Sequence, residues 1–283
     1  MMKERIISTI VLFLSIAGIL AVMGVFGGVL VLTFFSALTQ WELYQLMEKI
    51  GWKPHKKSAT IFGIIILMGS FFSGKGLFDF HYDISMLALT IGIFASHLVS
   101  MGKPEDLKSI FLPTIFGILY VPIMLCIPLS FIRELSLLWW ESNLPLLFIL
   151  WIIVVTKFSD IGGLIIGSKF GKHKLAPVFS PQKTYEGLLG SILFSIAAGR
   201  IFAFCCGHSW PSHFMDMKMD IVSVLIATIA LISDLVESGF KRLAGEKDSG
   251  NTISGIGGAF DLMDSLILTL PMGVIIIREF ILF

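Results

Sequence analysis

Four carboxylates near the C-terminal end of the chain have a spacing that suits metal-ion chemistry. Asp234 and Glu237 are three residues apart, and Asp261 and Asp264 repeat this spacing further along. Residues three apart share one face of a helix, so each pair offers its oxygens in one direction. Mg²⁺ takes one or two protein carboxylates and completes its shell with water and phosphate. The sequence therefore predicts these four residues as Mg²⁺ ligands, and leaves open a second divalent or monovalent cation.

The segment between the two acidic pairs is basic and rich in glycine. Lys and Arg side chains bind phosphate, and glycine lets a backbone approach a ligand closely. A set of salt bridges between two helices is the alternative interpretation, but salt bridges alone do not require the glycines. The candidate residues for phosphate binding are Lys241, Arg242 and Lys247, with Gly250, Gly255, Gly257 and Gly258 for close backbone approach.

A second polar group lies upstream, where one apolar run ends and the next begins. The N-terminal N–H groups of a helix bind anions, and a lysine beside them strengthens the binding. An ordinary basic loop with a helix cap is the alternative. The glycines here lack the spacing of a P-loop or of a dinucleotide-binding fingerprint. The candidates in this group are Asp160, Lys172, Lys174, Ser180, Lys183 and Thr184.

The composition places these polar groups in a membrane protein. Hydrophobic residues make up 55% of the 283-residue chain and charged residues 14%, against about 25% charged in a soluble domain. A net charge of +1 without a basic stripe gives no indication of nucleic-acid binding. We predict an all-α, polytopic integral membrane protein of about nine transmembrane helices. The expected spans are 6–23, 25–46, 58–72, 84–99, 110–131, 144–166, 187–205, 221–240 and 265–283. The first two form either a tight hairpin or one long broken element.

Lysine and arginine residues gather on one side of this predicted topology, which orients the chain. We expect the N-terminus in the cytoplasm, the C-terminus outside, and a bacterial-type inner (plasma) membrane. The polar loops 167–186 and 241–260 then face the cytoplasm, where nucleotides could reach them. We divide the chain into N-terminal transmembrane helices, 1–135, and a C-terminal catalytic region, 136–283.

Together these motifs resemble those of the phosphatidate cytidylyltransferase (CDP-diacylglycerol synthase) family. The resemblance covers roughly 155–270. It rests on Ser180-Pro181-x-Lys183-Thr184, Ser238-x-x-Lys241-Arg242, Lys247-Asp248-x-Gly250 and Gly257-Gly258-x-x-Asp261-x-x-Asp264. The chain departs from the family pattern at three positions, since Ser254 replaces a proline, Ile256 a histidine and Leu262 an arginine. All the motif carboxylates remain.

The resemblance implies that CTP and phosphatidate react at the bilayer surface to give CDP-diacylglycerol and pyrophosphate, with Mg²⁺ as cofactor and a homodimer as the assembly. It implies a catalytic set of Lys183, Asp234, Lys241, Arg242, Asp261 and Asp264. It also implies a substrate-binding set of Asp160, Lys172, Lys174, Ser180, Thr184, Lys247, Asp248, Gly257 and Gly258.

Two other functions stay open at this point. A CTP-dependent polyprenol or phytol kinase would transfer the γ-phosphoryl group to an alcohol and release CDP. A cation-coupled transporter would need polar residues through the depth of several helices, whereas here they concentrate at one end of the last four spans.

Overall fold

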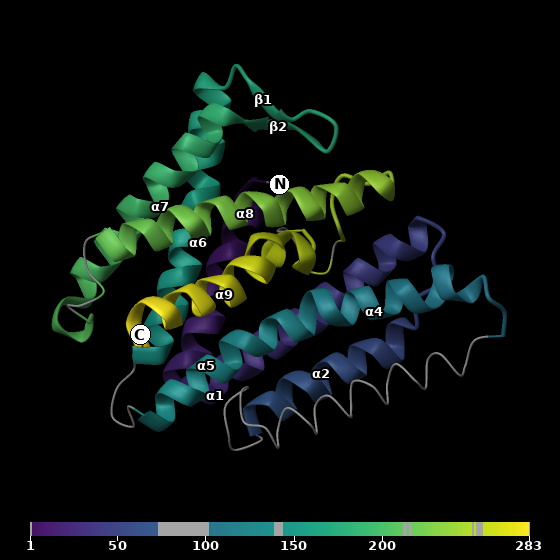
Figure 1. The fold of residues 1–283 in the computed structure, drawn as a ribbon, viewed down its shortest axis with the longest axis horizontal. Helices are drawn as coiled ribbons and strands as arrows, with labels where there is room; N and C mark the ends of the chain where they lie inside the picture. The colour runs from purple at the N-terminus through teal and green to yellow at the C-terminus, as the bar shows by residue number, and fades with distance from the viewer. Residues whose placement is uncertain are drawn as a thin grey trace. The chain divides into compact units, whose positions relative to one another are not determined.

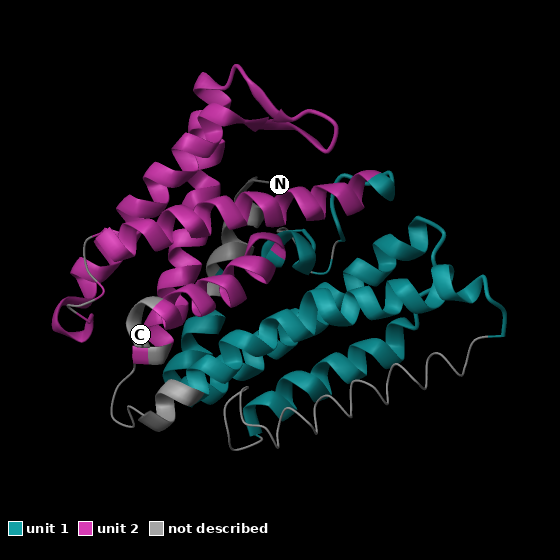
Figure 2. Ribbon diagram, viewed as in Figure 1, with its two compact units in different colours: residues 1–134, 243–263 teal, residues 135–242, 264–283 magenta. Residues whose placement is uncertain are grey.

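The computed structural model describes residues 2–72, 102–138, 144–211, 214, 217–250, 252 and 257–282 (Figure 1). They divide into two compact units, unit 1 with Met1–Glu134 and Leu243–Met263, and unit 2 with Leu135–Arg242 and Asp264–Phe283 (Figure 2). Helices α5, α8 and α9 each contribute residues to both units.

Unit 1 is built on the long element α1, Met2–Lys49, which is broken at Gly24 (φ 55°, ψ −133°). Two helices meet at this break, and the chain turns back sharply there, since a Cβ on Gly27 would lie 2.7 Å from the carbonyl oxygen of Ile19. Helix α2, Lys56–Phe72, follows. The next helical run changes type repeatedly, with the elements η1 Leu107–Phe111, α4 Leu112–Ile118, η2 Leu119–Ile123 and α5 Met124–Leu138. Both η elements are π-helical. Prolines 122 and 128 lie inside this run, where a missing N–H disfavours regular α-helical bonding.

Small residues let the helices of unit 1 pack closely. A Cβ on Gly63 of α2 would lie 2.4 Å from the side-chain oxygen of Gln40, and one on Gly117 of α4 would lie 2.4 Å from the Tyr44 ring. The Tyr44 hydroxyl donates to the carbonyl of Thr114 over 2.7 Å. Through these contacts α1 packs against both α2 and α4.

Unit 2 contains α6 Leu144–Phe170, a hairpin of β1 Lys174–Ala176 and β2 Ser180–Thr184, α7 Tyr185–Cys206, the short 3₁₀ turn η3 Gly207–Ser209, α8 Met217–Leu243 and α9 Ala259–Leu282. The hairpin is antiparallel and pairs Lys174 with Thr184. The described residues are otherwise mainly helical, which confirms the predicted all-α class, and the short hairpin is an addition to it. Strands of three and five residues are too short to show an alternating pattern in the sequence.

Helices α6 and α7 pack along a line of small residues. A Cβ on Gly162 would lie 2.5 Å from the carbonyl oxygen of Gly190, and one on Gly190 would lie 2.5 Å from Ile166. Small residues of this kind allow membrane helices to approach closely. This close packing of α6 and α7 supports the hairpin that connects them.

Six helices among the described residues are long and apolar enough to cross a membrane, in agreement with the prediction of a helical integral membrane protein. They are Leu14–Lys49, Leu107–Arg133, Leu146–Phe170, Tyr185–Ser209, Met217–Leu243 and Ala259–Glu279. The predicted span 84–99 lies outside the described residues. The total of nine stays a prediction.

Candidate functional site

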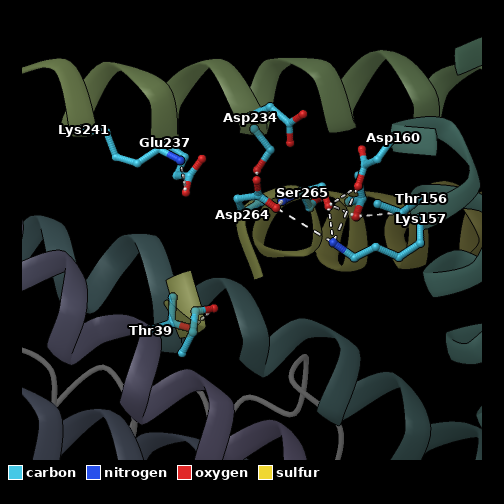
Figure 3. Close-up of polar contacts among 12 residues, drawn as sticks. Thr39, Thr156, Lys157, Asp160, Asp234, Glu237, Lys241, Asp264 and Ser265 are labelled. Carbon is cyan, nitrogen blue, oxygen red and sulfur yellow. Dashed lines mark hydrogen bonds and ion pairs between the residues drawn. The ribbon is translucent and has the colours of Figure 1, made fainter. Parts of the chain in front are cut away.

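Three carboxylates of unit 2 lie close together, and each comes from a different helix (Figure 3). Asp160 belongs to α6, Asp234 to α8 and Asp264 to α9, and their charges act on one another. Asp234 is 9% exposed. Its Oδ1 atom is buried and accepts no hydrogen bond from the residues that the structure describes. Negative charges gathered among apolar helices are costly unless cations compensate them.

Lys157 of α6 supplies part of that compensation (Figure 3). Its Nζ atom lies 3.6 Å from Asp160 and 3.9 Å from Asp264, and it donates to Ser265 Oγ over 2.8 Å. The candidate set from the sequence lacks this residue. A signal was present, because a lysine inside the predicted span 144–166 is a charged group at membrane depth, and such groups are usually functional.

Lys183 compensates Asp234. It is the fourth residue of strand β2, and its Nζ lies 2.5 Å from Asp234 Oδ2. Burial works against the charge on Lys183, but the Asp234 carboxylate outweighs this effect and raises the pKa of Lys183 above its ordinary value. Lys183 therefore stays protonated at neutral pH. The hairpin that sequence analysis treated as a loop is the element that brings this lysine to the carboxylates.

Neutral hydroxyl groups connect the helices around the charged groups. Ser233 of α8 donates through Oγ to the carbonyl oxygen of Asp264. Ser265 of α9 donates through Oγ to Asp160 Oδ2 over 3.0 Å. One turn further along α9, Thr269 is 3.1 Å from Thr156 of α6. These bonds hold α6, α8 and α9 at the level of the carboxylates.

Glu237 pairs with a lysine of its own helix. Its Oε1 lies 2.9 Å from the Nζ of Lys241, and the two side chains are 3% and 17% exposed (Figure 3). The i, i+4 spacing of the pair suits a helical ion pair. The predicted metal ligand Glu237 and the predicted phosphate ligand Lys241 are thus brought together, and each neutralises the other.

Asp261 lies in unit 1, at the start of the same helix that carries Asp264. Its carboxylate accepts the N–H of Gly258 over 3.0 Å and the N–H of Ser249 over 3.2 Å. A carboxylate in the first turn of a helix is favoured by the helix dipole and by the N–H groups that lack partners there. In unit 1, the Asp261 carboxylate therefore holds the backbone at Ser249 and Gly258, which precede it in the sequence.

The remaining predicted residues differ in their local structure and in their exposure to solvent. Thr184 caps α7, because its Oγ1 accepts the N–H of Gly187 over 3.0 Å, and it is 4% exposed. Gly257 has a φ of 126°, which a residue with a side chain rarely adopts. Ser180 is half-buried. The exposed members are Lys172, Lys174, Arg242, Lys247 and Asp248.

Ser249 and its neighbours are held by a further acidic residue that the candidate set lacks. Glu42 of α1 is 0% exposed, and it accepts hydrogen bonds from Ser249, Thr252 and Phe260. Its position within the apolar run 25–46 was the signal in the sequence.

The carboxylates of unit 2 fit a hard divalent cation in their chemistry. Asp160, Asp234 and Asp264 offer only oxygen, which Mg²⁺ prefers. The Oδ1 atom of Asp234 is a buried acceptor that a cation would satisfy. Within the described ranges, no three His, Cys, Asp or Glu side chains are already placed as metal ligands, and Lys157 and Lys183 supply the positive charge.

Apolar helices around an acidic, lysine-lined site define an integral membrane protein whose site suits phosphate groups and cations. The sequence matches the model of the cytidylyltransferase family over residues 3–280, and the chain belongs to this family. This confirms the resemblance seen in the motifs.

Relatives of the chain carry one name. A protein named phosphatidate cytidylyltransferase from Staphylococcus saprophyticus is 30% identical over 253 residues, which is 87% of this chain and 89% of the relative. Proteins of the same name from Staphylococcus epidermidis and Staphylococcus haemolyticus are 42% and 40% identical over 130 residues, 44% of this chain. In these two the match spans about half of the relative, 46%.

Proposed function

We propose that this protein transfers the cytidylyl group of CTP to phosphatidate, giving CDP-diacylglycerol and pyrophosphate. The observation that carries the proposal is the polar layer of unit 2, where Asp160, Asp234 and Asp264 meet Lys157 and Lys183 among apolar helices. Such a layer can accept two polyanionic substrates while the acyl chains remain in the bilayer. The names of the relatives support the same reaction.

The reaction is an in-line displacement at the α-phosphorus of CTP. A phosphate oxygen of phosphatidate forms the new P–O bond, and the bond to the β-phosphate breaks with its electron pair leaving on pyrophosphate. A phosphate monoester is already largely ionised near neutral pH, so the attack needs no strong general base. Compensation of negative charge is the main task of the protein.

The basic side chains perform this task. Lys183 is held charged beside Asp234, and Lys241 lies beside Glu237. Arg242, Lys247, Lys172 and Lys174 are exposed and can reach the triphosphate or the lipid headgroup. Gly257 and Gly258 allow the backbone to approach the phosphates closely.

The acidic side chains would hold the cation. Asp234 and Asp264, with Asp261 three residues earlier on α9, are the proposed ligands of Mg²⁺, and Asp160 and Glu237 lie next in line. When bound, Mg²⁺ supplies charge neutralisation at the phosphates. Lys157 and Lys183 contact these carboxylates and offset part of their negative charge.

The proposed topology has nine spans, with a cytoplasmic N-terminus in the bacterial inner membrane. It predicts that the C-terminal end of α6 and the turn that follows α7 lie on opposite sides of the membrane. In a cysteine-free background, Ser168→Cys should react with an impermeant maleimide only in inverted vesicles, and Ser209→Cys only in intact cells. The reverse pattern would overturn the orientation.

We also propose that the protein works as a homodimer, as the family resemblance suggests. Its mass in detergent, measured by light scattering with correction for bound detergent, should be twice that of one chain. A mass of one chain at concentrations where the protein is active would overturn this.

The reaction is tested with purified protein, Mg²⁺, phosphatidate and CTP labelled on either the α- or the γ-phosphate. The α-label should enter the lipid and the γ-label should appear in pyrophosphate. A lipid kinase would instead place the γ-label in a lipid product when given polyprenol. No lipid-linked α-label from folded protein would contradict the proposal.

A further inference from the structure

Glu42 is the most completely buried acidic residue in the described part of the chain, and the reaction proposed above does not use it. It is 0% exposed and lies in the last third of α1, within unit 1. A carboxylate in such surroundings is expensive to keep unless hydrogen bonds satisfy it. Its partners should therefore indicate what it is for.

Among the described residues, the partners of Glu42 come from one distant segment of the sequence, residues 249–260. Glu42 Oε2 accepts the Phe260 N–H over 2.9 Å and the Ser249 hydroxyl over 3.0 Å, and Oε1 accepts the Thr252 hydroxyl. Phe260 lies in the first turn of α9, where N–H groups have no partner within the helix. One turn before Glu42, Thr39 donates to the carbonyl oxygen of Ala259 over 3.4 Å. Helix α1 thus contacts both the start and the end of this segment.

Two glycines give the carboxylate room to reach these donors. A Cβ on Gly250 would lie 2.6 Å from Glu42 Oε1, and one on Gly258 would lie 2.5 Å from Oε2 and 2.0 Å from Ser249 Oγ. Moving the Glu42 carboxylate aside to admit a larger side chain would break its hydrogen bonds to three donors. The glycines at these positions are therefore matched to Glu42, in addition to any contact with a ligand.

The segment that Glu42 holds is the one that carries the phosphate-binding motif. Ser249 is fixed on two sides, since its hydroxyl donates to Glu42 and its N–H donates to Asp261. Gly257 and Gly258 lie between these anchors, and Asp261 follows. Loss of Glu42 would release the segment without removing any group that touches the nucleotide.

We propose that Glu42 is a positioning residue that holds Ser249, Thr252 and the first turn of α9 at Phe260 in the arrangement that binds the CTP triphosphate. The proposal rests on the proposed function, because CTP is taken as the ligand of this segment. Hydrogen bonding, and not charge, is what the site requires of residue 42, since all three donors are neutral groups. Glutamine should therefore serve, because its oxygen can replace Oε2 and its amide can donate to the Thr252 hydroxyl.

The test compares Glu42→Ala, Glu42→Gln and the control Glu48→Ala on the full-length protein. Glu48 is an exposed residue of the same helix that pairs with Lys56. Equilibrium binding of CTP is measured without phosphatidate, beside thermal unfolding and the KM of each substrate. We expect Glu42→Ala to weaken CTP binding by about tenfold or more, the loss of one to two buried hydrogen bonds. We expect Glu42→Gln to stay within about threefold and Glu48→Ala to match the wild type. The KM for phosphatidate should change little.

A second variant tests the match between Glu42 and Gly250 by a double-mutant cycle. Gly250→Ala alone should weaken CTP binding as Glu42→Ala does. In the Glu42→Ala background the added methyl group has room, so Gly250→Ala should cost little more. Additive losses would overturn the proposal. So would wild-type CTP binding by folded Glu42→Ala, or equal losses in the Gln and Ala variants that follow their melting temperatures. Wild-type protein that binds no CTP would instead overturn the proposed function itself.

Discussion

Glu42 and Asp234 are both nearly inaccessible to solvent, 0% and 9% exposed, but they have different kinds of partner. In unit 1, two hydroxyls and one backbone N–H donate to Glu42. In unit 2, the ammonium group of Lys183 contacts Asp234, and Lys157 contacts the neighbouring Asp160 and Asp264. One carboxylate is thus held by neutral groups and the others by movable cations.

We call Glu42 the fixed anchor, and we call the lysine-paired carboxylates Asp160, Asp234 and Asp264 the exchangeable site. Hydrogen bonds from the backbone and from short side chains leave Glu42 no alternative position. A lysine side chain has a long flexible stem, so it can leave a carboxylate when a metal ion or a phosphate arrives. In the sequence these acidic residues look alike, because each is a charged residue in an apolar chain. Their partners distinguish a carboxylate held by neutral donors from carboxylates held by lysines.

The largest effect is expected when a carboxylate of the exchangeable site loses its charge. Asp264→Asn keeps the shape of the side chain but removes a proposed cation ligand and a partner of Lys157. We expect kcat to fall on the order of 10³-fold, with the protein still folded and expressed. Steady-state kinetics with α-labelled CTP measures this. Activity within tenfold of the wild type would remove Asp264 from the cation site.

A smaller effect is expected from the lysine that sequence analysis missed. Lys157→Met removes the ammonium group between Asp160 and Asp264, and we expect a loss of about 10- to 100-fold in kcat, typical of groups that orient metal ligands. Lys169→Met, an exposed lysine in the last turn of the same helix, is the matched control and should stay near wild-type activity. Equal effects of the two variants would mean that Lys157 contributes only to the overall charge.

The smallest effect is expected at Thr184, whose side chain, like that of Glu42, accepts a hydrogen bond from a neutral donor. Thr184→Ala removes the cap of α7, which should cost about 1 kcal/mol of stability. Thr184→Ser should restore the cap. We expect lower melting temperatures for the alanine variant only, with CTP affinity unchanged in both at a temperature where they are folded. A large loss of CTP affinity in Thr184→Ala would instead support the substrate-binding role that the sequence suggested.

Much of unit 2 could be predicted from the sequence because long apolar runs determine membrane helices. The predicted spans 144–166 and 221–240 lie inside α6 Leu144–Phe170 and α8 Met217–Leu243. The helices extend beyond the apolar runs because polar residues such as Lys169 continue the backbone hydrogen bonding. The hairpin was not predictable, since its strands are too short to show a pattern.

The candidate site was predictable in its residues and less so in their partners. The i, i+3 spacing predicted the pairs Asp234/Glu237 and Asp261/Asp264, and the structure instead brings one member of each pair, Asp234 and Asp264, near Asp160. The partners of Glu42 lie more than 200 residues away in sequence, and no local rule connects residues at that distance. The pairing of Glu237 with Lys241 follows the i, i+4 rule, which the sequence analysis did not apply.

The most direct test is a comparison of Asp234→Asn with Glu42→Gln, in one assay of CDP-diacylglycerol formation. Each variant removes one negative charge from a buried carboxylate and keeps its shape. We predict that Asp234→Asn loses at least about 100-fold in kcat/KM for CTP, whereas Glu42→Gln stays within about threefold. Equal losses in the two variants, or near-normal activity of Asp234→Asn, would contradict the distinction between the exchangeable site and the fixed anchor.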